Sequence, residues 1–381
     1  MVRNENSKVS IVKVSESVES AVKVAISLAG GMASVVEKGD TIYLKPNFVA
    51  PRKSLSGVTT DFEVIKTVAE EVKRCGGNPV IYETPAMEFD RKNVYDVLGV
   101  RDFAERNGIR IADEAVDYVK ISVPGGKVFK SLRVPGFLKG AKIINLPKLK
   151  THVTARMTCG MKNLIGLLPD EEKRRCHVMG VHASIADICK ILKPVLTVVD
   201  AVTCLEGDGP TYGDPKDVGL IVAGENMVSV DRICSRIIGI PPEGLEYINL
   251  YYNGSQPENI ETAGESVEAV KSTFKIPEKS AFYHLSTRMI HVLDIPYSKI
   301  FPGHFNRFMF STGYFGTNPK IIEEKCDKCG KCVEVCPVDN ALNLDGYGVE
   351  YKNCIRCMEC YLVCDNKAIM VKGFSRPEDQ Q

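Results

Sequence analysis

The chain has 381 residues, of which 44% are hydrophobic and 25% are charged, and its formal net charge is +1. This is the composition of a globular protein of two or three domains, and the near-zero charge gives no electrostatic case for binding nucleic acid or an anionic membrane surface. The N-terminal residues lack the apolar segment of a signal peptide, and the longest apolar runs are far shorter than the roughly 20 residues of a membrane helix. We therefore expect a cytoplasmic protein without nucleic-acid or membrane partners.

Short apolar strands and amphipathic helices alternate through residues 1–265. A hairpin is expected around the "PGG" at 124–126, and Gly-Gly pairs end the first two helices. This alternation predicts an α/β domain with a mostly parallel sheet and flanking helices, in which ligands bind at the carboxyl ends of the strands. Strands are predicted at 9–15, 41–47, 79–83, 141–148, 196–202 and 217–224, and helices at 18–32, 59–77, within 155–192, and at 227–240.

The rest of the chain differs in character. Residues 266–320 are rich in aromatic side chains and lack strong periodicity, so we expect a connecting segment packed between domains or a lid over a site. Residues 321–373 are predicted to form a second, small α+β domain. Residues 374–381 form a polar tail that we expect to fray.

Two cysteine runs define the second domain: "CDKCGKCVEVCP" at 326–337 and "CIRCMECYLVCD" at 354–365. Both have the spacing that holds [4Fe–4S] clusters, and in two-cluster ferredoxins the fourth cysteine of each run ligates the other cluster. Zinc is the alternative, but it seldom uses two identical runs of this kind. The expected ligands are Cys326, Cys329, Cys332 and Cys364 for cluster 1, and Cys354, Cys357, Cys360 and Cys336 for cluster 2.

This region resembles bacterial-type two-cluster ferredoxins, although Asp365 stands where the proline after the second run would be. The resemblance implies a role in electron transfer. The remaining cysteines are scattered through the α/β domain, where a reducing compartment favours free thiols. They are Cys75, Cys159, Cys176, Cys189, Cys204 and Cys234.

The segment at 145–169 is the strongest candidate for a site in the α/β domain. It follows a predicted strand and gathers basic and amide groups beside a helix start, which favours an anion. A solvated basic loop is the alternative. The residues concerned are Lys148, Lys150, His152, Arg156, Lys162 and Asn163.

Two further segments follow strands. Lys45 and Asn47 precede a predicted helix start that would favour an anion, and the chain has neither of the glycine-rich nucleotide motifs. Asp200, Glu206 and Asp208 lie in a glycine-rich stretch and could hold a hard cation or transfer protons. Ordinary turns are the alternative for both segments. His177 and His182 would either ligate a metal or face solvent.

Several motifs of the α/β domain resemble the family called domain of unknown function 362, over residues 8–250. The motifs are "LKPN", "NLPKLKTH", "GMKNLIG", "VVDAVTCLEGDGP" and "VSVDRI". Members of that family often carry a C-terminal two-cluster ferredoxin module.

A more distant likeness is to the N-terminal domain of nickel-pincer lactate racemases. It would place His152 and Lys162 at the positions of a histidine and of the lysine that tethers the pyridinium cofactor, and His177 at a nickel ligand. The stretch "CGMKNLIG" departs from that pattern, because it lacks the doubled glycine and the arginine before the lysine.

These features lead to a first hypothesis, a ferredoxin-coupled oxidoreductase that passes electrons from two [4Fe–4S] clusters to an anionic substrate or cofactor in the α/β domain. His152 would transfer protons, and Lys162 and Asn163 would stabilise negative charge. A further metal or organic cofactor stays open, with His152, His177 and Asp200 as its candidate ligands. Substrate binding is assigned to Lys45, Asn47, Lys148, Lys150, Arg156, Asp200, Glu206 and Asp208.

The alternative hypothesis is a non-catalytic electron-transfer or metal-handling protein that docks on a partner enzyme. Both hypotheses require a redox partner protein or another electron donor. A catalytic protein should enclose the lysine and histidine side chains in a pocket that faces the clusters, whereas a docking module should display a hydrophobic or charged surface near them.

Overall fold

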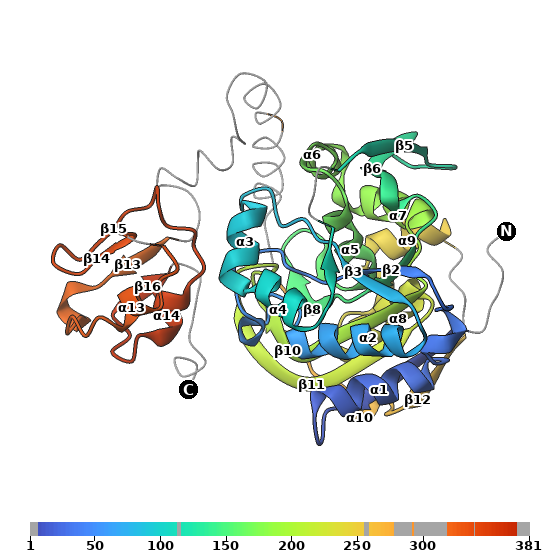
Figure 1. Cartoon of the computed structure of the whole chain (residues 1–381), viewed down its shortest axis with the longest axis horizontal. Coiled ribbons are helices and arrows are strands. Elements are labelled where there is room, and N and C mark those ends of the chain that lie inside the picture. Colours follow the sequence, from blue (N-terminus) through green and yellow to red (C-terminus); the bar gives the residue numbers. More distant parts are fainter. Residues whose placement is uncertain are drawn as a thin grey trace.

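The structure is a computed structural model that describes residues 7–112, 116–254, 259–277, 292, 318–338 and 340–371. It consists of an α/β body and a small C-terminal domain that lies beside one end of the body (Figure 1). None of the helices in the described ranges has the length and apolar character needed to span a bilayer.

The body is built on a ten-stranded sheet whose main path has the order β12-β1-β11-β10-β7-β2-β3-β4. The run from β10 to β4 is parallel, whereas β11 is antiparallel to both β1 and β10. The predicted α/β class with a mostly parallel sheet is confirmed. The strands of the sheet are β1 Ser7–Lys13, β2 Thr41–Lys45, β3 Asn78–Ile81, β4 Arg110–Ile111, β7 Lys142–Asn145, β8 Lys148–His152, β9 Arg156–Thr158, β10 Leu196–Glu206, β11 Asp214–Gly224 and β12 Ile260–Gly264.

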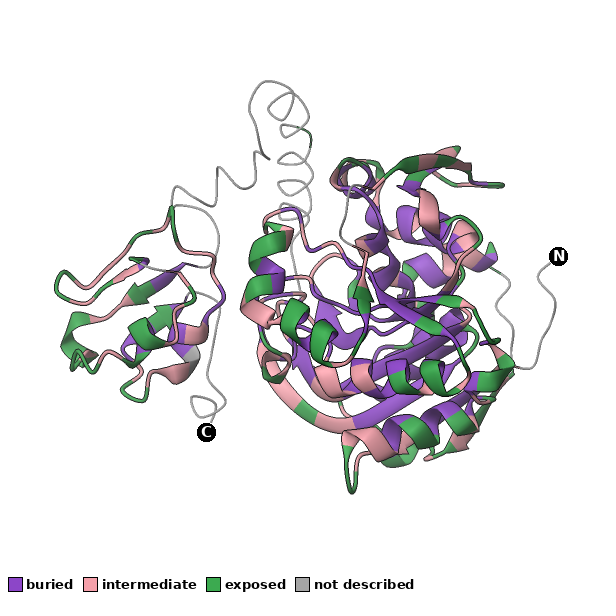
Figure 2. Ribbon diagram, viewed as in Figure 1, coloured by how far each residue is buried: buried purple, intermediate pink, exposed green. Residues whose placement is uncertain are grey.

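Helices cover both faces of the sheet and form two hydrophobic cores with it (Figure 2). One core lies under α1 Val18–Leu28, α2 Phe62–Arg74, α3 Arg91–Leu98 and α4 Val100–Arg106. The other core lies under α5 Gly160–Asn163, α6 Asp170–Met179, α7 Val181–Ile191, α8 Met227–Ile237, α9 Glu246–Tyr252 and α10 Val267–Val270, together with the hairpin of β5 Tyr118–Ser122 and β6 Ser131–Pro135. Short 3₁₀ helices are η1 Met32–Ser34, η2 Ser54–Ser56, η3 Gly136–Leu138, η4 Leu164–Leu167, η5 Pro242–Gly244 and η6 Glu323–Lys325.

Helix α2 illustrates how local sequence sets these elements. The Asp61 side chain caps it by accepting a hydrogen bond from the backbone N–H of Glu63 at 2.8 Å. Its apolar residues at 64, 65, 68 and 72 form one buried stripe, as helical spacing requires. Two glycines at 76 and 77 follow its end, so the chain turns into β3.

The elements α3, α4, β4, α9 and β12 were not predicted, and two predicted segments differ from expectation. The stretch at 155–192 begins with strand β9 and then divides into α5, η4, α6 and α7, with Gly180 at φ 115° between the last two helices. Strand β10 continues to Glu206, because it pairs with β11 along this whole length. Asp200 and Glu206 therefore lie within a strand and not on a glycine-rich loop after it.

The C-terminal domain has two small antiparallel sheets and two short helices. Its core is formed by Met358, Tyr361, Ile369 and Val371 with two of the cysteines. Its elements are β13 Pro319–Ile321, α13 Lys331–Glu334, β14 Leu342–Asn343, β15 Gly348–Val349, α14 Glu359–Val363 and β16 Ile369–Val371.

The predicted connecting segment, 266–320, lies largely outside the described residues, as does the tail at 374–381. In its described part, Val270 and Phe274 pack into the core under α5 to α9. The domain boundaries stay a prediction.

Candidate functional site

Cysteines from both runs meet in the C-terminal domain as the crossed ferredoxin pattern requires. Cys336, from the first run, lines one cavity with Cys354, Cys357 and Cys360 from the second, and the other walls of this cavity are mainly apolar. Burial, together with neighbouring Cys336 and Cys354, raises the pKa of the Cys357 thiol to about 12. Four thiols around an apolar cavity are the donor set of a [4Fe–4S] cluster, so these residues fit cluster 2.

The other four cysteines also lie near one another. Burial raises the pKa of Cys332, and Cys364, Cys326 and Cys329 act on it in the same direction. This set is closer to solvent, since Cys329 is exposed whereas Cys357 and Cys360 are buried. It corresponds to the predicted ligands of cluster 1.

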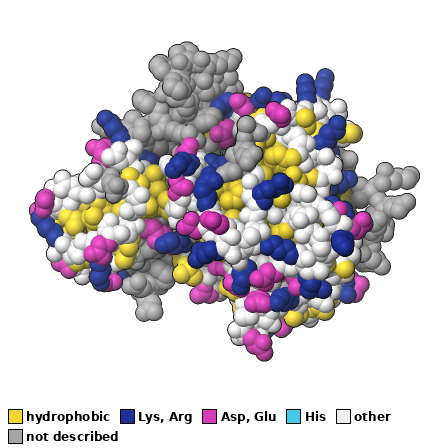
Figure 3. All heavy atoms as spheres, viewed as in Figure 1, with side chains coloured by type: hydrophobic (Ala, Val, Ile, Leu, Met, Phe, Trp, Pro, Cys, Tyr) yellow, Lys and Arg dark blue, Asp and Glu magenta, His cyan; other side chains and the backbone are white. Residues whose placement is uncertain are grey.

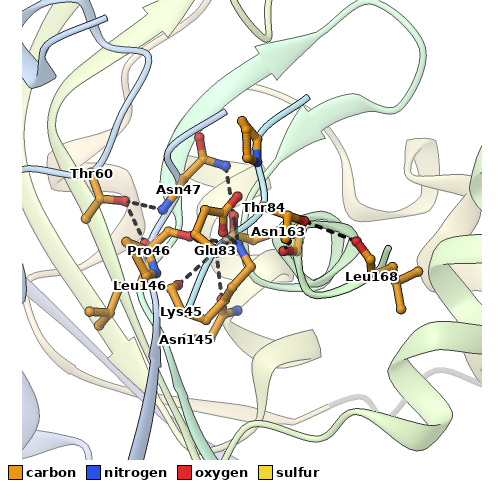
Figure 4. A network of polar contacts seen from close by, with 12 residues as sticks. Lys45, Pro46, Asn47, Thr60, Glu83, Thr84, Asn145, Leu146, Asn163 and Leu168 are labelled. Carbon is orange, nitrogen blue, oxygen red and sulfur yellow. Dashed lines mark hydrogen bonds and ion pairs between the residues drawn. The ribbon is translucent and has the colours of Figure 1, made fainter. Parts of the chain in front are cut away.

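In the body, a buried ion pair joins the ends of two neighbouring strands. Lys45 ends β2, Glu83 follows β3 by two residues, and both side chains are almost fully buried. Figure 4 shows the Lys45 side chain between Glu83 and Asn163, and its ammonium also donates to Asn163 Oδ1 at 3.2 Å. Burial lowers the pKa of Lys45 and raises that of Glu83 to about 7. Each group therefore depends on the other for its charge.

Three asparagine side chains form a network around this pair (Figure 4). Asn163 Nδ2 donates to Asn145 Oδ1 and Asn47 Nδ2 donates to Asn163 Oδ1, both at 2.8 Å. Asn145 in turn donates to the Gly160 carbonyl at 2.8 Å, which ties β7 to helix α5. The network holds the carboxyl ends of β2 and β7 in register with α5, and all three amides are buried.

A second buried ion pair joins strands β8 and β10. Lys148 Nζ is 2.8 Å from Asp200 Oδ2, and both side chains have no more than 1% exposure. The same carboxylate oxygen accepts the Asp61 backbone N–H at 2.8 Å. Asp200 is thus occupied by a lysine and a backbone donor. In the described ranges, no group of three or more His, Cys, Asp or Glu side chains is placed to hold a single metal ion.

Lys150 is the third buried lysine, and it differs from the other two. Its ammonium donates to Asn47 Oδ1 at 2.8 Å and to the Val58 carbonyl at 2.5 Å, but it has no ion pair among the described residues. Burial lowers its pKa well below the usual value, and nearby Lys162 and Lys148 lower it further. The site therefore has more buried basic groups than carboxylates.

His152 lies next to this lysine as a neutral imidazole. Its Nδ1 accepts the backbone N–H groups of Thr154 at 3.0 Å and Ala155 at 3.1 Å, so the ring proton resides on Nε2. Burial lowers its pKa well below the usual value, and Lys162 and His177 add to the effect. This differs from the sequence-based expectation that the ring titrates near the working pH.

Lys162 lies on the outer side of this group of buried lysines, and its own side chain is half-buried. Burial lowers its pKa to about 8, with Lys45 and Lys173 acting in the same direction and Cys176 against it. A lysine with such a pKa carries a proton that it can release near neutral pH.

The remaining candidates do not join this group. Arg156 is exposed and directs its guanidinium toward the Gly244 carbonyl at 3.5 Å. Glu206 pairs with Lys216 at 3.0 Å, so it lies in a separate ion pair.

Two other predicted residues lie elsewhere. Asp208 is half-buried in the bend after β10. The His182 ring stacks on the Tyr247 ring, with 6.2 Å between their centroids. The group that the structure brings together, which we call the lysine cluster, consists of Lys45, Lys148, Lys150, Lys162, His152, Glu83, Asp200, Asn47, Asn145 and Asn163.

Two buried carboxyl groups with a raised pKa were not predicted. Glu83 could have been found by the rule that pointed to Lys45, since it lies two residues beyond the carboxyl end of β3 in the same sheet. Asp231 lies on α8 and accepts the backbone N–H of Met161 at 3.2 Å, and burial raises its pKa to about 7. The sequence signal that could have identified Asp231 was its position on the apolar face of a predicted amphipathic helix.

These features define an α/β protein with a buried basic site and a two-cluster iron–sulfur domain. The chain belongs to the family described as Domain of unknown function (DUF362), which matches residues 42–236. Residues 318–368 match the 4Fe-4S dicluster domain. The predicted family and cluster domain are confirmed, and the protein is an iron–sulfur electron-transfer protein.

Relatives and a solved structure extend this comparison. The chain is 30% identical over 266 residues to a thylakoid-associated protein of Synechocystis sp., covering 65% of this chain and 80% of that protein. It is 34% identical over 59 residues to an uncharacterized protein of Porphyra purpurea, covering 13% of this chain and 79% of that protein. The lactate racemase apoprotein of Thermoanaerobacterium thermosaccharolyticum is similar in structure with a TM-score of 0.41 and 14% identity, over 61% of this chain and 57% of that one.

Proposed function

We propose that this protein is a cytoplasmic iron–sulfur oxidoreductase that reduces a small anionic compound bound at the lysine cluster. The observation that carries the proposal is Lys150, a buried amine without an ion pair among the described residues. Lys45 and Lys148 each have a carboxylate partner, whereas no ion pair of Lys150 or Lys162 is found in the described part of the chain. A carboxylate or phosphate on the substrate would supply the missing negative charge.

The position of the site supports a link with the clusters, which supply electrons one at a time when bound. The loop between β2 and α2, residues 46–61, contributes Asn47 and the Val58 carbonyl to Lys150. The same loop meets the C-terminal domain, where Lys53 Nζ lies 3.3 Å from Glu359 Oε2. One short segment thus contacts both the buried amine and the domain that holds the cysteines.

Proton supply falls to Lys162 in this proposal. Reduction of a carbonyl or an activated double bond takes two electrons and two protons. With a pKa of about 8, Lys162 can give up one proton at neutral pH and regain it from solvent, since its side chain is half-buried. His152 would use its Nε2–H as a fixed hydrogen-bond donor to developing negative charge.

The test uses anaerobically purified protein reduced with dithionite and freed of excess reductant. The visible absorbance of the reduced clusters is followed after adding 2-oxo carboxylates, 2,3-unsaturated carboxylates or acyl phosphates. Saturated carboxylates serve as controls that can bind but cannot accept electrons. We expect saturable reoxidation by at least one reducible anion and none by its saturated analogue.

Two variants make the test specific to the site. Lys150→Met should abolish anion-dependent reoxidation while keeping the visible spectrum and about eight irons per chain. Lys120→Met, on the exposed strand β5, should behave as wild type. If no anion reoxidises the clusters, or if Lys150→Met reoxidises at the wild-type rate, the proposed reductase activity is wrong.

A second candidate is a non-catalytic electron-transfer protein that docks on a partner enzyme. It is favoured by the exposure of Cys329 and of Val333, whose side chain on α13 is 44% exposed beside Cys332. Under this alternative, the reduced protein passes electrons to an added acceptor protein, and Lys150→Met does so at the wild-type rate.

A further inference from the structure

The contact between the body and the C-terminal domain involves the part of that domain that holds cluster 2. On the domain side lie Cys357 and Glu359, and on the body side lie two adjacent basic residues, Arg52 and Lys53. The Lys53 ammonium pairs with Glu359 at 3.3 Å, and its side chain is 64% exposed. Arg52, which precedes Lys53, is only 2% exposed, and Cys357, a predicted ligand of cluster 2, lies two residues before Glu359. The Cys357 thiol opposes the lowering of the Arg52 pKa by burial, as expected for a group nearby.

Arg52 is held firmly at this contact. Its guanidinium lies over the Tyr212 ring, 4.8 Å from the centroid, and its carbonyl accepts the Thr59 hydroxyl at 2.6 Å. Thr59 directly follows Val58, whose carbonyl contacts Lys150. The loop at 46–61 therefore fixes a buried guanidinium on its outer side and a buried amine on its inner side.

A guanidinium keeps its charge even where burial lowers its pKa, as it does here. A charge that is shielded from water acts more strongly on its neighbours than an exposed one, because less solvent screens it. Of the two basic residues on the body side of the contact, Arg52 is thus placed to act on the Cys357 side, whereas Lys53 is largely exposed and already paired.

We propose that Arg52 sets the reduction potential of cluster 2 by stabilising its reduced form, and that cluster 2 is the cluster facing the α/β body. One-electron reduction makes the cluster more negative by one charge without making or breaking a bond to the protein, and a fixed buried cation favours that state. The potential of an iron–sulfur cluster depends on the net charge and solvent exposure around it. The inference requires the two clusters but not the proposed substrate reduction, so either can fail alone.

The test is a redox titration monitored by electron paramagnetic resonance, with the potential poised by chemical mediators. To isolate cluster 2, the titration is done in a Cys326→Ala background, in which about four irons per chain remain. We expect Arg52→Gln to lower the reduced-to-oxidised ratio of cluster 2 at a fixed potential by about tenfold, which is a 59 mV change for one electron.

Matched variants separate charge from structure. Arg52→Lys keeps the charge and should retain most of the wild-type potential, whereas Lys53→Gln removes an adjacent exposed charge and should change the ratio less than twofold. Cluster 1, titrated alone in a Cys354→Ala background, should not respond to Arg52→Gln. Iron content and the urea midpoint of the body are measured on every variant to verify folding.

Three results would overturn the proposal. If the potential of cluster 2 is unchanged in folded, iron-replete Arg52→Gln, the charge of Arg52 does not set that potential. If the potentials of both clusters shift equally, cluster 2 is not the cluster that faces the α/β body. A shift in Arg52→Lys as large as in Arg52→Gln would mean that packing, and not charge, sets the potential.

Discussion

At the scale of single residues, the lysine cluster concentrates ionisable groups that, apart from the half-buried Lys162, are shielded from water. Lys45 and Glu83 are separated by more than 30 residues in sequence but form an ion pair with almost no exposure. Such a pair contributes little net stability, since desolvation opposes the attraction, but removing one partner leaves an uncompensated charge. The pair therefore acts as a fixed constraint on the positions of β2 and β3.

Glu83→Gln is expected to destabilise the body strongly. Lys45 would keep a buried ammonium without its carboxylate, at a cost of about 3–5 kcal/mol. Urea unfolding followed by far-ultraviolet circular dichroism measures the change. The double variant Lys45→Met with Glu83→Leu removes both charges and should recover much of the loss; if it is as unstable as Glu83→Gln, the cost comes from packing instead.

Asp231 predicts a pH dependence of stability. Its ordinary pKa of 3.8 is raised to about 7 in the folded protein, mainly by burial. The folded state binds this proton more tightly than the unfolded state, so the contribution is fully present below pH 3.8 and is lost as the pH rises through about 7. The loss amounts to as much as about 4 kcal/mol.

Asp231→Asn should flatten this part of the profile, because an amide is neutral at every pH. Unfolding free energies at pH 5, 6, 7 and 8 provide the measurement. The difference between wild type and Asp231→Asn should change in favour of the variant as pH rises. Parallel profiles would mean that Asp231 titrates alike in the folded and unfolded states.

At the scale of elements, the loop at 46–61 is shaped by one close approach. Gly57 has φ 72°, and a side chain on it would overlap the carbonyl of Cys204 in β10. Only glycine combines this backbone conformation with this contact. The position of Val58 depends on Gly57, and so does the hydrogen bond that the Val58 carbonyl accepts from Lys150.

Gly57→Ala is therefore expected to be more harmful than the same change at Gly99. Gly99 has the same φ of 72° but open space where a Cβ would lie, so its alanine variant isolates the backbone cost of about 1 kcal/mol. Gly57→Ala adds a clash worth about 1–3 kcal/mol more. The two urea midpoints are compared directly, and equal losses would show that the loop moves freely away from β10.

Most elements of the fold could be predicted from sequence, because their signals are local. Apolar alternation, caps and glycine pairs located the strands and helices, and the strand-end rule led to Lys45 and Lys148. The partners in space could not be predicted, since pairing of Lys45 with Glu83 depends on strand order. Arg156 shares its segment with Lys150, but the turn at φ 66° points it away from the cluster.

At the scale of the molecule, the two domains have separate cores of very different size. In its described part, the core of the C-terminal domain has six buried side chains, two of them the predicted cluster ligands Cys332 and Cys360. A core this small does not normally sustain a fold without a metal centre or a crosslink. The clusters should therefore supply much of the folding free energy of this domain.

Removing iron with a chelator under reducing conditions is expected to unfold residues 318–371 and leave the body folded. Limited proteolysis should then cleave within the C-terminal domain only, while the urea midpoint of the body changes little. A protease-resistant C-terminal domain without iron would contradict this expectation. A body that unfolds together with it would show that the two cores are one cooperative unit.

The sheet also has a consequence for synthesis. Strand β1, which leaves the ribosome before the other strands of the sheet, lies inside the sheet, where Val9 pairs with Gly224 of β11 and with Thr262 of β12. At the usual rate of translation, β11 follows β1 by roughly 10–40 s. During this interval β1 lacks both of its neighbours, so its backbone edges and apolar side chains stay unpaired. The cysteine runs are synthesised after every strand of the sheet, so the sheet can form before the predicted cluster ligands are available.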